Sequence, residues 1–265
     1  MPVFRHFGDP PPTARDAKLD GGMWRVPEEV PAALVYNGRN YAVMLTTPAD
    51  LEDFAVGFSL TERVVDDLSE IISVDIYFID RGIELRIDIA SDRIERLDTV
   101  LRRRNLAGRA SCGLCGLENA ETFFEVLPRV SDTLLLIDQH TLLRALRALP
   151  RFQALNEETR TVHAAAWVGS SGNIALARED VGRHNALDKL MGALSRRGVE
   201  IESGFLLMSS RCSYEIVEKA ARCGVRAIAS ISAPTAFALR KAREANIALY
   251  ARDRERFVMF DQSSE

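Results

Sequence analysis

Several features that would place this chain in a membrane or outside the cell are missing from its sequence. No apolar run approaches the roughly 20 residues that a helix needs to cross a bilayer. The N-terminus lacks the basic, apolar and small-residue zones of a signal peptide. We therefore expect a cytoplasmic protein that does not associate with membranes.

An excess of basic residues is also missing, because the formal net charge is −4 at pH 7. Such a chain has no general electrostatic attraction to nucleic acid or to anionic lipid. We expect no nucleic-acid partner. Anionic ligands then have to be recognised by local groups of basic residues.

Cysteine is scarce, with only Cys112, Cys115, Cys212 and Cys223 among 265 residues. Four cysteines are too few for a secreted disulfide scaffold of this length, so redox, metal or nucleophilic chemistry is the more natural interpretation. A structural zinc site usually needs two Cys-x-x-Cys pairs, or one pair with histidines. Cys212 and Cys223 are eleven positions apart and no His-x-x-x-His occurs, so we predict no metal site. Their spacing places both on one face of a helix, as small buried apolar residues.

The pattern of apolar residues divides the chain into three parts. Residues 1–22 contain three consecutive prolines and little apolar periodicity, which indicates a flexible arm. Residues 23–125 favour an α+β subdomain that ends in the Cys-x-x-Cys loop. Residues 126–265 alternate strands and helices and favour a layered α/β domain.

In the first half, residues 33–36 and 41–45 predict a β-hairpin around the Asn37-Gly38 turn. Thr47 and Pro48 predict the cap and first position of a short amphipathic helix. Alternating apolar residues over 72–78 and 83–89 predict two antiparallel strands.

The second half predicts six strands and three helices. The strands are expected at 162–168, 174–177, 205–208, 227–231, 247–250 and 257–260. The helices are expected at 185–196, 213–223 and 235–245, each with Asn, Ser or Thr near its start.

The segment Ser111-Cys112-Gly113-Leu114-Cys115-Gly116 places two thiols in a glycine-flanked loop. Arginines at 102, 103, 104 and 109 precede it, and their positive potential favours the thiolate form if the loop folds back near them. A mobile, exposed thiolate can hold an extra sulfur as a persulfide. Spacing and context leave redox and sulfur-carrying roles equally open, with unreactive cysteines as a third interpretation.

Three further segments are candidates for binding anions. Ser209-Ser210-Arg211 and Ser232-Ala233-Pro234-Thr235 follow predicted strands and precede helices, where free N–H groups favour phosphate. Ordinary helix capping is the alternative for both. Tyr250-Ala251-Arg252-Asp253-Arg254-Glu255-Arg256 ends a strand with three arginines suited to phosphate or pterin oxygens, and a solvated hairpin turn is its alternative. A fourth polar segment, Glu179 to Lys189, reads EDVGRHNALDK and is otherwise explained as a turn in which His184 or Asn185 caps a helix.

In order, the cysteine loop, EDVGRHNALDK, Ser209-Ser210-Arg211, Ser232-Ala233-Pro234-Thr235 and Tyr250-Ala251-Arg252 resemble the formate dehydrogenase accessory sulfurtransferases, the FdhD family. The resemblance runs from about Val30 to Phe260. It implies a sulfurtransferase that takes sulfur from a cysteine desulfurase. It also implies delivery to the molybdenum (or tungsten) bis-molybdopterin guanine dinucleotide cofactor of formate dehydrogenase, which GDP would partly mimic. A homodimer is the family expectation.

By the same resemblance, Cys112 matches the persulfide-bearing position, and Cys115 is a helper or alternative carrier. The family's cofactor-binding stretch falls on Tyr250 to Arg256, where this chain holds one residue more than the usual spacing between Arg252 and the arginine before Phe257. The second half would adopt a cytidine deaminase-like α/β/α fold. The His-x-Glu and Pro-Cys-x-x-Cys elements of deaminases are absent, so the resemblance implies no deaminase chemistry.

Overall fold

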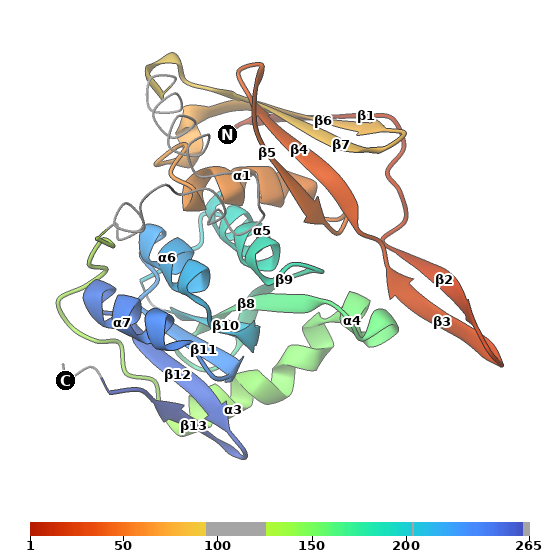
Figure 1. The fold of residues 1–265 in the computed structure, drawn as a ribbon. Helices are drawn as coiled ribbons and strands as arrows, with labels where there is room; N and C mark the ends of the chain where they lie inside the picture. Colours follow the sequence, from red (N-terminus) through yellow and green to blue (C-terminus); the bar gives the residue numbers. More distant parts are fainter. Residues whose placement is uncertain (94–125, 203, 262–265) are drawn as a thin grey trace.

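The structure of the chain is a computed structural model that describes residues 1–93, 126–202 and 204–261, and it consists of two lobes packed together (Figure 1). The N-terminal lobe contains a five-stranded sheet in the order β1-β6-β7-β4-β5. Its strands are β1 (Val3–Phe7), β4 (Val30–Tyr36), β5 (Arg39–Thr46), β6 (Ile71–Ile79) and β7 (Gly82–Ile89). Helix α1 (Leu51–Thr61) covers one face, and short 3-10 turns follow at η1 (Leu68–Glu70) and η2 (Ser91–Arg93).

The hairpin and the two antiparallel strands predicted for this lobe are confirmed. Strands β4 and β5 pair across a turn in which Asn37 and Gly38 both have positive φ angles, of 46° and 75°. Only a few residue types tolerate this conformation, and Asn-Gly is the preferred pair. Strands β6 and β7 pair antiparallel and direct Val74, Ile76, Leu85 and Ile87 into the core.

The prediction of a flexible arm over residues 1–22 is wrong about its secondary structure. Strand β1 pairs in parallel with β6 as an edge of the sheet. Strands β2 (Ala14–Leu19) and β3 (Gly22–Pro27) form a separate hairpin that projects from the body (Figure 1). The sequence lacks a clear apolar alternation here because β1 lies at an edge and most of the hairpin is exposed.

The second lobe is built on a six-stranded sheet in the order β13-β12-β11-β10-β8-β9. Its strands are β8 (His163–Gly169), β9 (Ile174–Asp180), β10 (Gly204–Arg211), β11 (Ala227–Ser232), β12 (Ala248–Asp253) and β13 (Arg256–Met259). Helices α5 (Arg183–Arg196), α6 (Tyr214–Arg222) and α7 (Ala236–Ala245) pack on one face. The other face is covered by α3 (Gln139–Ala148) and η4 (Leu149–Phe152), which leads into α4 (Ala154–Thr159).

All six strands and all three helices predicted for the second half are therefore confirmed within a residue or two at most ends. The described chain is a mixed α/β protein whose second lobe has three layers. Helix α3, the 3-10 turn η4 and helix α4 were not predicted. The likeness of this lobe to cytidine deaminases stays a prediction.

Predictions about the cysteines beside α6 and about the cap of α1 are wrong. Cys212 precedes α6 and Cys223 caps its C-terminus, so they flank the helix rather than share its face; Cys212 is fully buried and Cys223 half-buried. Thr47 does not cap α1, which begins at Leu51 after Asp50. Instead Thr47 binds residues of the second lobe.

Helices α1 and α5 join the lobes by a backbone-to-backbone crossing. A Cβ atom at Gly57 would lie 1.7 Å from the carbonyl oxygen of Asp188, and one at Gly192 would lie 1.9 Å from that of Asp53. Only glycine at both positions allows this approach. As a result α1 is buried on nearly all sides, by its own sheet and by α5.

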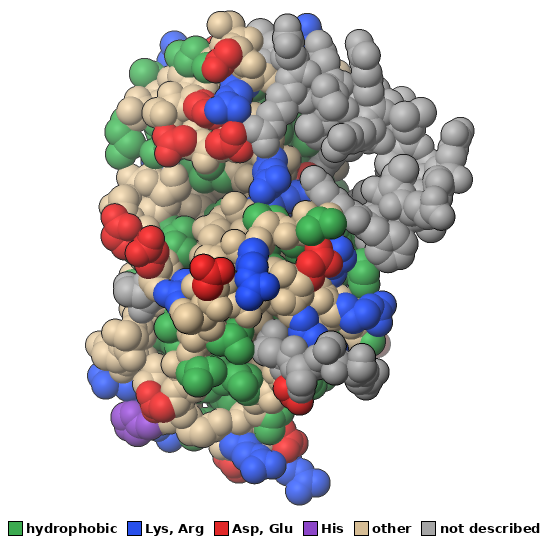
Figure 2. Space-filling view, turned by 90° about the vertical axis from the view of Figure 1, so that its left-hand side faces the viewer, with side chains coloured by type: hydrophobic (Ala, Val, Ile, Leu, Met, Phe, Trp, Pro, Cys, Tyr) green, Lys and Arg blue, Asp and Glu red, His purple; other side chains and the backbone are tan. Residues whose placement is uncertain are grey.

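Within the described ranges, no helix has both the length and the apolar character needed to cross a membrane. Basic and acidic side chains are interspersed across the face shown in Figure 2.

Candidate functional site

The carboxyl ends of three strands meet at one edge of the second lobe's sheet. Strands β10, β11 and β12 are parallel, with Arg211 paired to Ser232 and Ser230 paired to Ala251. Helices α6 and α7 begin at this edge, directly after β10 and β11. Crevices outside the carboxyl ends of such strands are the usual ligand sites of open α/β sheets.

Most of the hydroxyl groups predicted to bind anions at this edge are used inside the protein. Ser209 accepts a hydrogen bond from the Ala164 amide at 2.7 Å. Thr235 caps α7 by accepting from the Ala238 amide at 3.2 Å, so capping explains this residue. Arg211 remains exposed at the edge.

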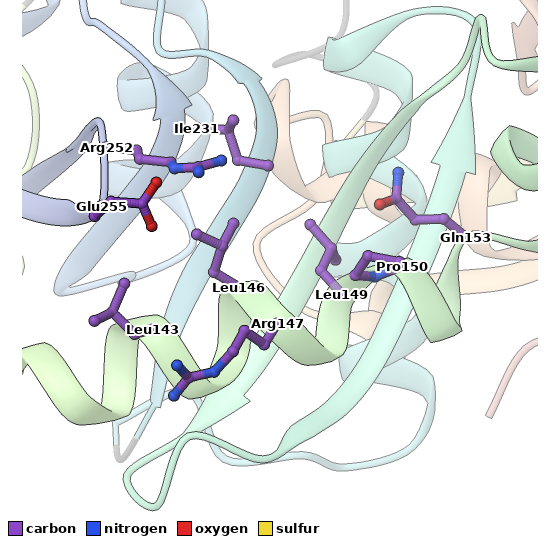
Figure 3. Close-up of a pocket in the computed structure, with 9 residues that line it drawn as sticks. All are labelled: Leu143, Leu146, Arg147, Leu149, Pro150, Gln153, Ile231, Arg252 and Glu255. Carbon is purple, nitrogen blue, oxygen red and sulfur yellow. The ribbon is translucent and has the colours of Figure 1, made fainter.

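A cavity of about 370 Å³ opens beside the ends of β11 and β12, between them and α3 with η4 (Figure 3). Its walls are mainly apolar, and four polar side chains lie among them. The lining residues are Leu143, Leu146, Arg147, Leu149, Pro150, Gln153, Ile231, Arg252 and Glu255. Arg252 and Glu255 lie on one side, and Gln153 lies with Pro150 at the other end (Figure 3).

The predicted cofactor stretch, Tyr250 to Arg256, forms the end of β12, a tight turn and the start of β13. Of its seven residues, only Arg252 and Glu255 line the cavity. Tyr250 and Ala251 are buried, and the Tyr250 hydroxyl accepts a hydrogen bond from the Ile137 amide at 2.9 Å. Asp253, Arg254 and Arg256 are exposed on the turn, where Arg254 has a positive φ of 55°.

Cys112 and Cys115 lie outside the described residues, so their surroundings remain a prediction. The two described cysteines are poor nucleophiles, because burial raises the pKa of Cys212 and of Cys223 to about 12. A thiolate is the reactive form of cysteine, and neither residue provides one near neutral pH. In the described ranges no three His, Cys, Asp or Glu side chains gather closely enough to hold a metal ion.

His184, at the start of α5, contacts the start of α6. Its Nε2 lies 3.4 Å from the Ser213 hydroxyl and 3.5 Å from a Glu215 carboxylate oxygen. The contact with His184 is the main cause that lowers the pKa of Glu215 to about 2. Neither His184 nor Asn185 caps α5, which begins after Gly182.

Comparison with known proteins identifies the family. The FdhD/NarQ family model matches residues 27–264. The chain belongs to the FdhD/NarQ family. The predicted resemblance is thereby confirmed.

Relatives named sulfur carrier protein FdhD match over most of their length. That of Bordetella petrii is 47% identical over 225 residues, which cover 85% of this chain and 80% of the relative. That of Xanthomonas euvesicatoria pv. vesicatoria is 45% identical over 255 residues, covering 96% and 87%. A crystal structure described as that of a proposed formate dehydrogenase accessory protein from Desulfotalea psychrophila aligns with a TM-score of 0.66 and 23% identity, over 94% of this chain and 96% of the other. At that identity it supports the fold alone.

In this FdhD/NarQ chain, EDVGRHNALDK is mostly buried between the lobes. Asp180 and Lys189 are fully buried and their charged atoms lie 2.6 Å apart. Asp180 also accepts from the Thr47 amide at 3.0 Å, and Lys189 donates to the Thr47 carbonyl at 2.8 Å. Asn185 donates to the Leu45 carbonyl at 2.7 Å. Several polar side chains of this segment therefore connect the two lobes, and we call these buried polar contacts between the lobes the joint.

A second buried contact extends this joint to α6. Lys219 donates to Asp188 at 2.9 Å and to Thr61 of α1 at 3.0 Å. Burial lowers the pKa of Lys219, but the negative charges of Asp188 and Glu62 outweigh burial and raise it. Lys219 therefore stays charged inside the joint.

Two parts of the site were not predicted from the sequence, namely Gln153 and the apolar side chains of α3 and η4. They lie about 100 residues before the hairpin in the chain, and only the fold brings them to the same cavity. The amphipathic pattern of α3 is a signal that would have predicted the helix, but not which residues it meets.

Proposed function

We propose that this chain is a cytoplasmic sulfur carrier that accepts sulfane sulfur from a cysteine desulfurase and transfers it to the molybdenum bis-molybdopterin guanine dinucleotide cofactor of formate dehydrogenase. The observation that supports this most directly is the identity of 45–49% to proteins named sulfur carrier protein FdhD over most of their length. We further propose that the working form is a homodimer.

The proposed chemistry requires one reactive thiolate. The Cys112 thiolate attacks the terminal sulfur of the desulfurase persulfide, the S–S bond of that persulfide breaks, and the desulfurase thiolate leaves. In the second step the S–S bond of the Cys112 persulfide breaks, Cys112 leaves as a thiolate, and the cofactor receives the terminal sulfur; the metal of the cofactor would supply the two electrons that reduce this sulfane sulfur to sulfide. The high pKa of Cys212 and Cys223 leaves Cys112 and Cys115 as the candidates among the four cysteines.

The cavity beside the hairpin supports cofactor binding at Tyr250 to Arg256. Arg252 provides a cation at the rim, and the apolar walls suit a flat ring. Gln153 is 8% exposed, and its side-chain amide has no hydrogen-bond partner among the described residues. An amide in the wall of the cavity can donate to and accept from a polar ligand.

The proposal is tested by incubating the protein with a cysteine desulfurase and cysteine, followed by mass spectrometry of the intact chain. We expect a gain of about one sulfur atom that a thiol reductant removes. Cys112→Ala should abolish or strongly reduce this gain. Cys223→Ala is the matched control and should retain it.

A disulfide between Cys112 and Cys115 that forms and is reduced in cycles, without any gain of sulfur, would favour a thiol-disulfide oxidoreductase instead. Full sulfur loading of the Cys112→Ala variant would show that Cys115 carries the sulfur.

A further inference from the structure

A group of basic side chains lies where β8 and α5 begin, at the edge of the second lobe's sheet that faces the joint, and has no role in the function proposed above. We propose that Arg183 and His163, with His184 beside them, bind a phosphate group, either as free phosphate or as a phosphate monoester. This site shares no residue with the cavity beside the β12–β13 hairpin. The inference does not rest on the proposed function.

The fold brings the three basic residues together from two elements. His163 is the first residue of β8 and pairs with Asp180 at the end of β9. Ala165 of the same strand packs in the core under α5, α6 and α7, and alternation along the strand directs His163 to the same face. Arg183 and His184 are the first residues of α5, which follows β9 directly. The charges of both act on the His163 ring, so the three groups lie close together.

The acidic side chains of this region already have basic partners. Asp180 is buried in the joint with its carboxylate 2.6 Å from the Lys189 ammonium. The Glu215 carboxylate lies 3.5 Å from His184. Among the described residues, Arg183 forms no ion pair with any carboxylate. Its positive charge is therefore available to an anionic ligand.

Arg183 also holds a hydrogen-bond donor that the protein does not use. Its Nε atom is buried and has no acceptor among the residues that the structure describes. A buried donor without an acceptor costs about 1–3 kcal/mol, so a ligand that accepts from it is favoured. The ring of His163 is half-buried, and in the described ranges it too forms no hydrogen bond.

The like charges of the group make an anion more favourable. Burial lowers the pKa of His163, and the positive charges of Arg183 and His184 lower it further, against an opposing effect of Asp180. Cations held close together repel one another, and an anion between them removes this repulsion. The site therefore gains from a ligand with negative charge.

The arrangement suits phosphate better than a carboxylate. A guanidinium binds phosphate oxygens through paired N–H groups. The imidazole of His163 comes from a different element and can reach a further oxygen, which a tetrahedral phosphate presents and a planar carboxylate lacks. Helix α5 begins here without a side-chain cap, and the positive end of its dipole favours negative charge.

The test is a titration of the full chain with sodium phosphate, followed by NMR of the ¹⁵N-labelled histidine rings at fixed pH and constant ionic strength. We expect the resonances of His163 and His184 to shift and reach saturation. His6 lies on β1 in the first lobe and is the internal reference, which should not shift. Single His→Gln variants assign the resonances.

Variants of the two main ligands measure their contributions. Arg183→Gln should weaken phosphate binding about 10-fold or more, as the loss of a charge-assisted hydrogen bond predicts. His163→Gln should weaken it about 3- to 10-fold. Arg197→Gln, which removes an exposed arginine at the other end of α5, is the matched control and should bind phosphate like the wild type. Far-UV circular dichroism checks that each variant is folded.

Two further titrations identify the ligand. Acetate at the same ionic strength should bind about 10-fold less tightly than phosphate, because it offers fewer oxygens. Ribose 5-phosphate distinguishes the two sources of the group: tighter binding than free phosphate would assign the site to a phosphorylated ligand, and weaker binding would assign it to the free ion.

The inference would be overturned if the resonances of His163 did not saturate, or if His6 shifted to the same extent. Equal affinity for acetate and phosphate would also overturn it, as would a folded Arg183→Gln variant that binds phosphate like the wild type. None of these results would affect the sulfur-carrier proposal, which is tested by the gain of sulfur on Cys112.

Discussion

The contact between His184 and Glu215 shows how a single residue sets a dependence on pH. The pKa of Glu215 is lowered from 4.5 to about 2 in the folded protein, mainly by the hydrogen bond with His184. A carboxyl group whose folded pKa is lowered stabilises the fold above its unfolded pKa, and this stabilisation is lost as the pH falls toward the folded value. The window is therefore between pH 4.5 and about 2.

We expect the wild type to lose up to about 3 kcal/mol more stability than Glu215→Gln across this window, at about 1.4 kcal/mol per unit of pKa shift. Urea unfolding of both proteins at a series of pH values from 5 to about 2.5 measures the difference. Glu200→Gln should follow the wild type throughout. Parallel curves for wild type and Glu215→Gln would show that the contact does not form in solution.

At the scale of elements, the crossing of α1 and α5 depends on two glycines. Alanine favours helices over glycine by about 1 kcal/mol, so propensity alone would make Gly57→Ala and Gly192→Ala stabilising. The added methyl group would instead overlap backbone atoms of the other helix. Overpacking of this kind costs about 1–3 kcal/mol or more, and we expect both variants to be destabilised.

Chemical denaturation of the two single variants and the double variant tests this expectation. Because both substitutions push the same helices apart, the double variant should lose less stability than the sum of the single losses. Stabilisation by either alanine would contradict the close crossing.

Local patterns predicted most elements of the fold, because each pattern is complete within a few residues. The Asn37-Gly38 turn and the alternating residues of β6 and β7 are examples. Thr47 shows where this fails, since its position before a helix predicts a cap but its partners lie in the second lobe. Strand β1 was not predicted for a similar reason, because it pairs with β6, which is far from it in the sequence.

The candidate site was predicted in part. Arg252 was found from its cluster of arginines, but Gln153 could not be, because a glutamine in an ordinary helix-to-helix connection has no local signal. The polar character of EDVGRHNALDK indicated a functional turn, yet Asp180 and Lys189 are buried in the joint. Charged residues that pair across the fold cannot be distinguished by sequence from charged residues that bind ligands.

At the scale of the whole molecule, the shared joint should make the lobes unfold together. The two tryptophans lie in different surroundings, because Trp167 is 2% exposed in the core of the second lobe and Trp24 is 43% exposed on the projecting hairpin. Replacing Trp24 leaves Trp167 as the fluorescent probe of unfolding in the second lobe. In a Trp24→Phe background, we expect Trp167 fluorescence and far-UV circular dichroism to give the same urea midpoint.

Lys189→Met in the same background should lower both midpoints together, with a loss of about 3–5 kcal/mol, because it leaves Asp180 buried without its cation. The exposed Arg197→Ala is the control and should leave the midpoints unchanged. Separate transitions for the two probes would show that the lobes fold independently.

The glycine crossing between α1 and α5 has a mechanical consequence. Two helices whose backbones touch cannot roll or slide over each other without losing that fit, and packed interfaces of this kind do not deform gradually. Within the described residues, the crossing therefore opposes a hinge motion of the lobes about α1 and α5. We therefore expect a ligand of the cavity beside the β12–β13 hairpin to bind without closure of one lobe onto the other.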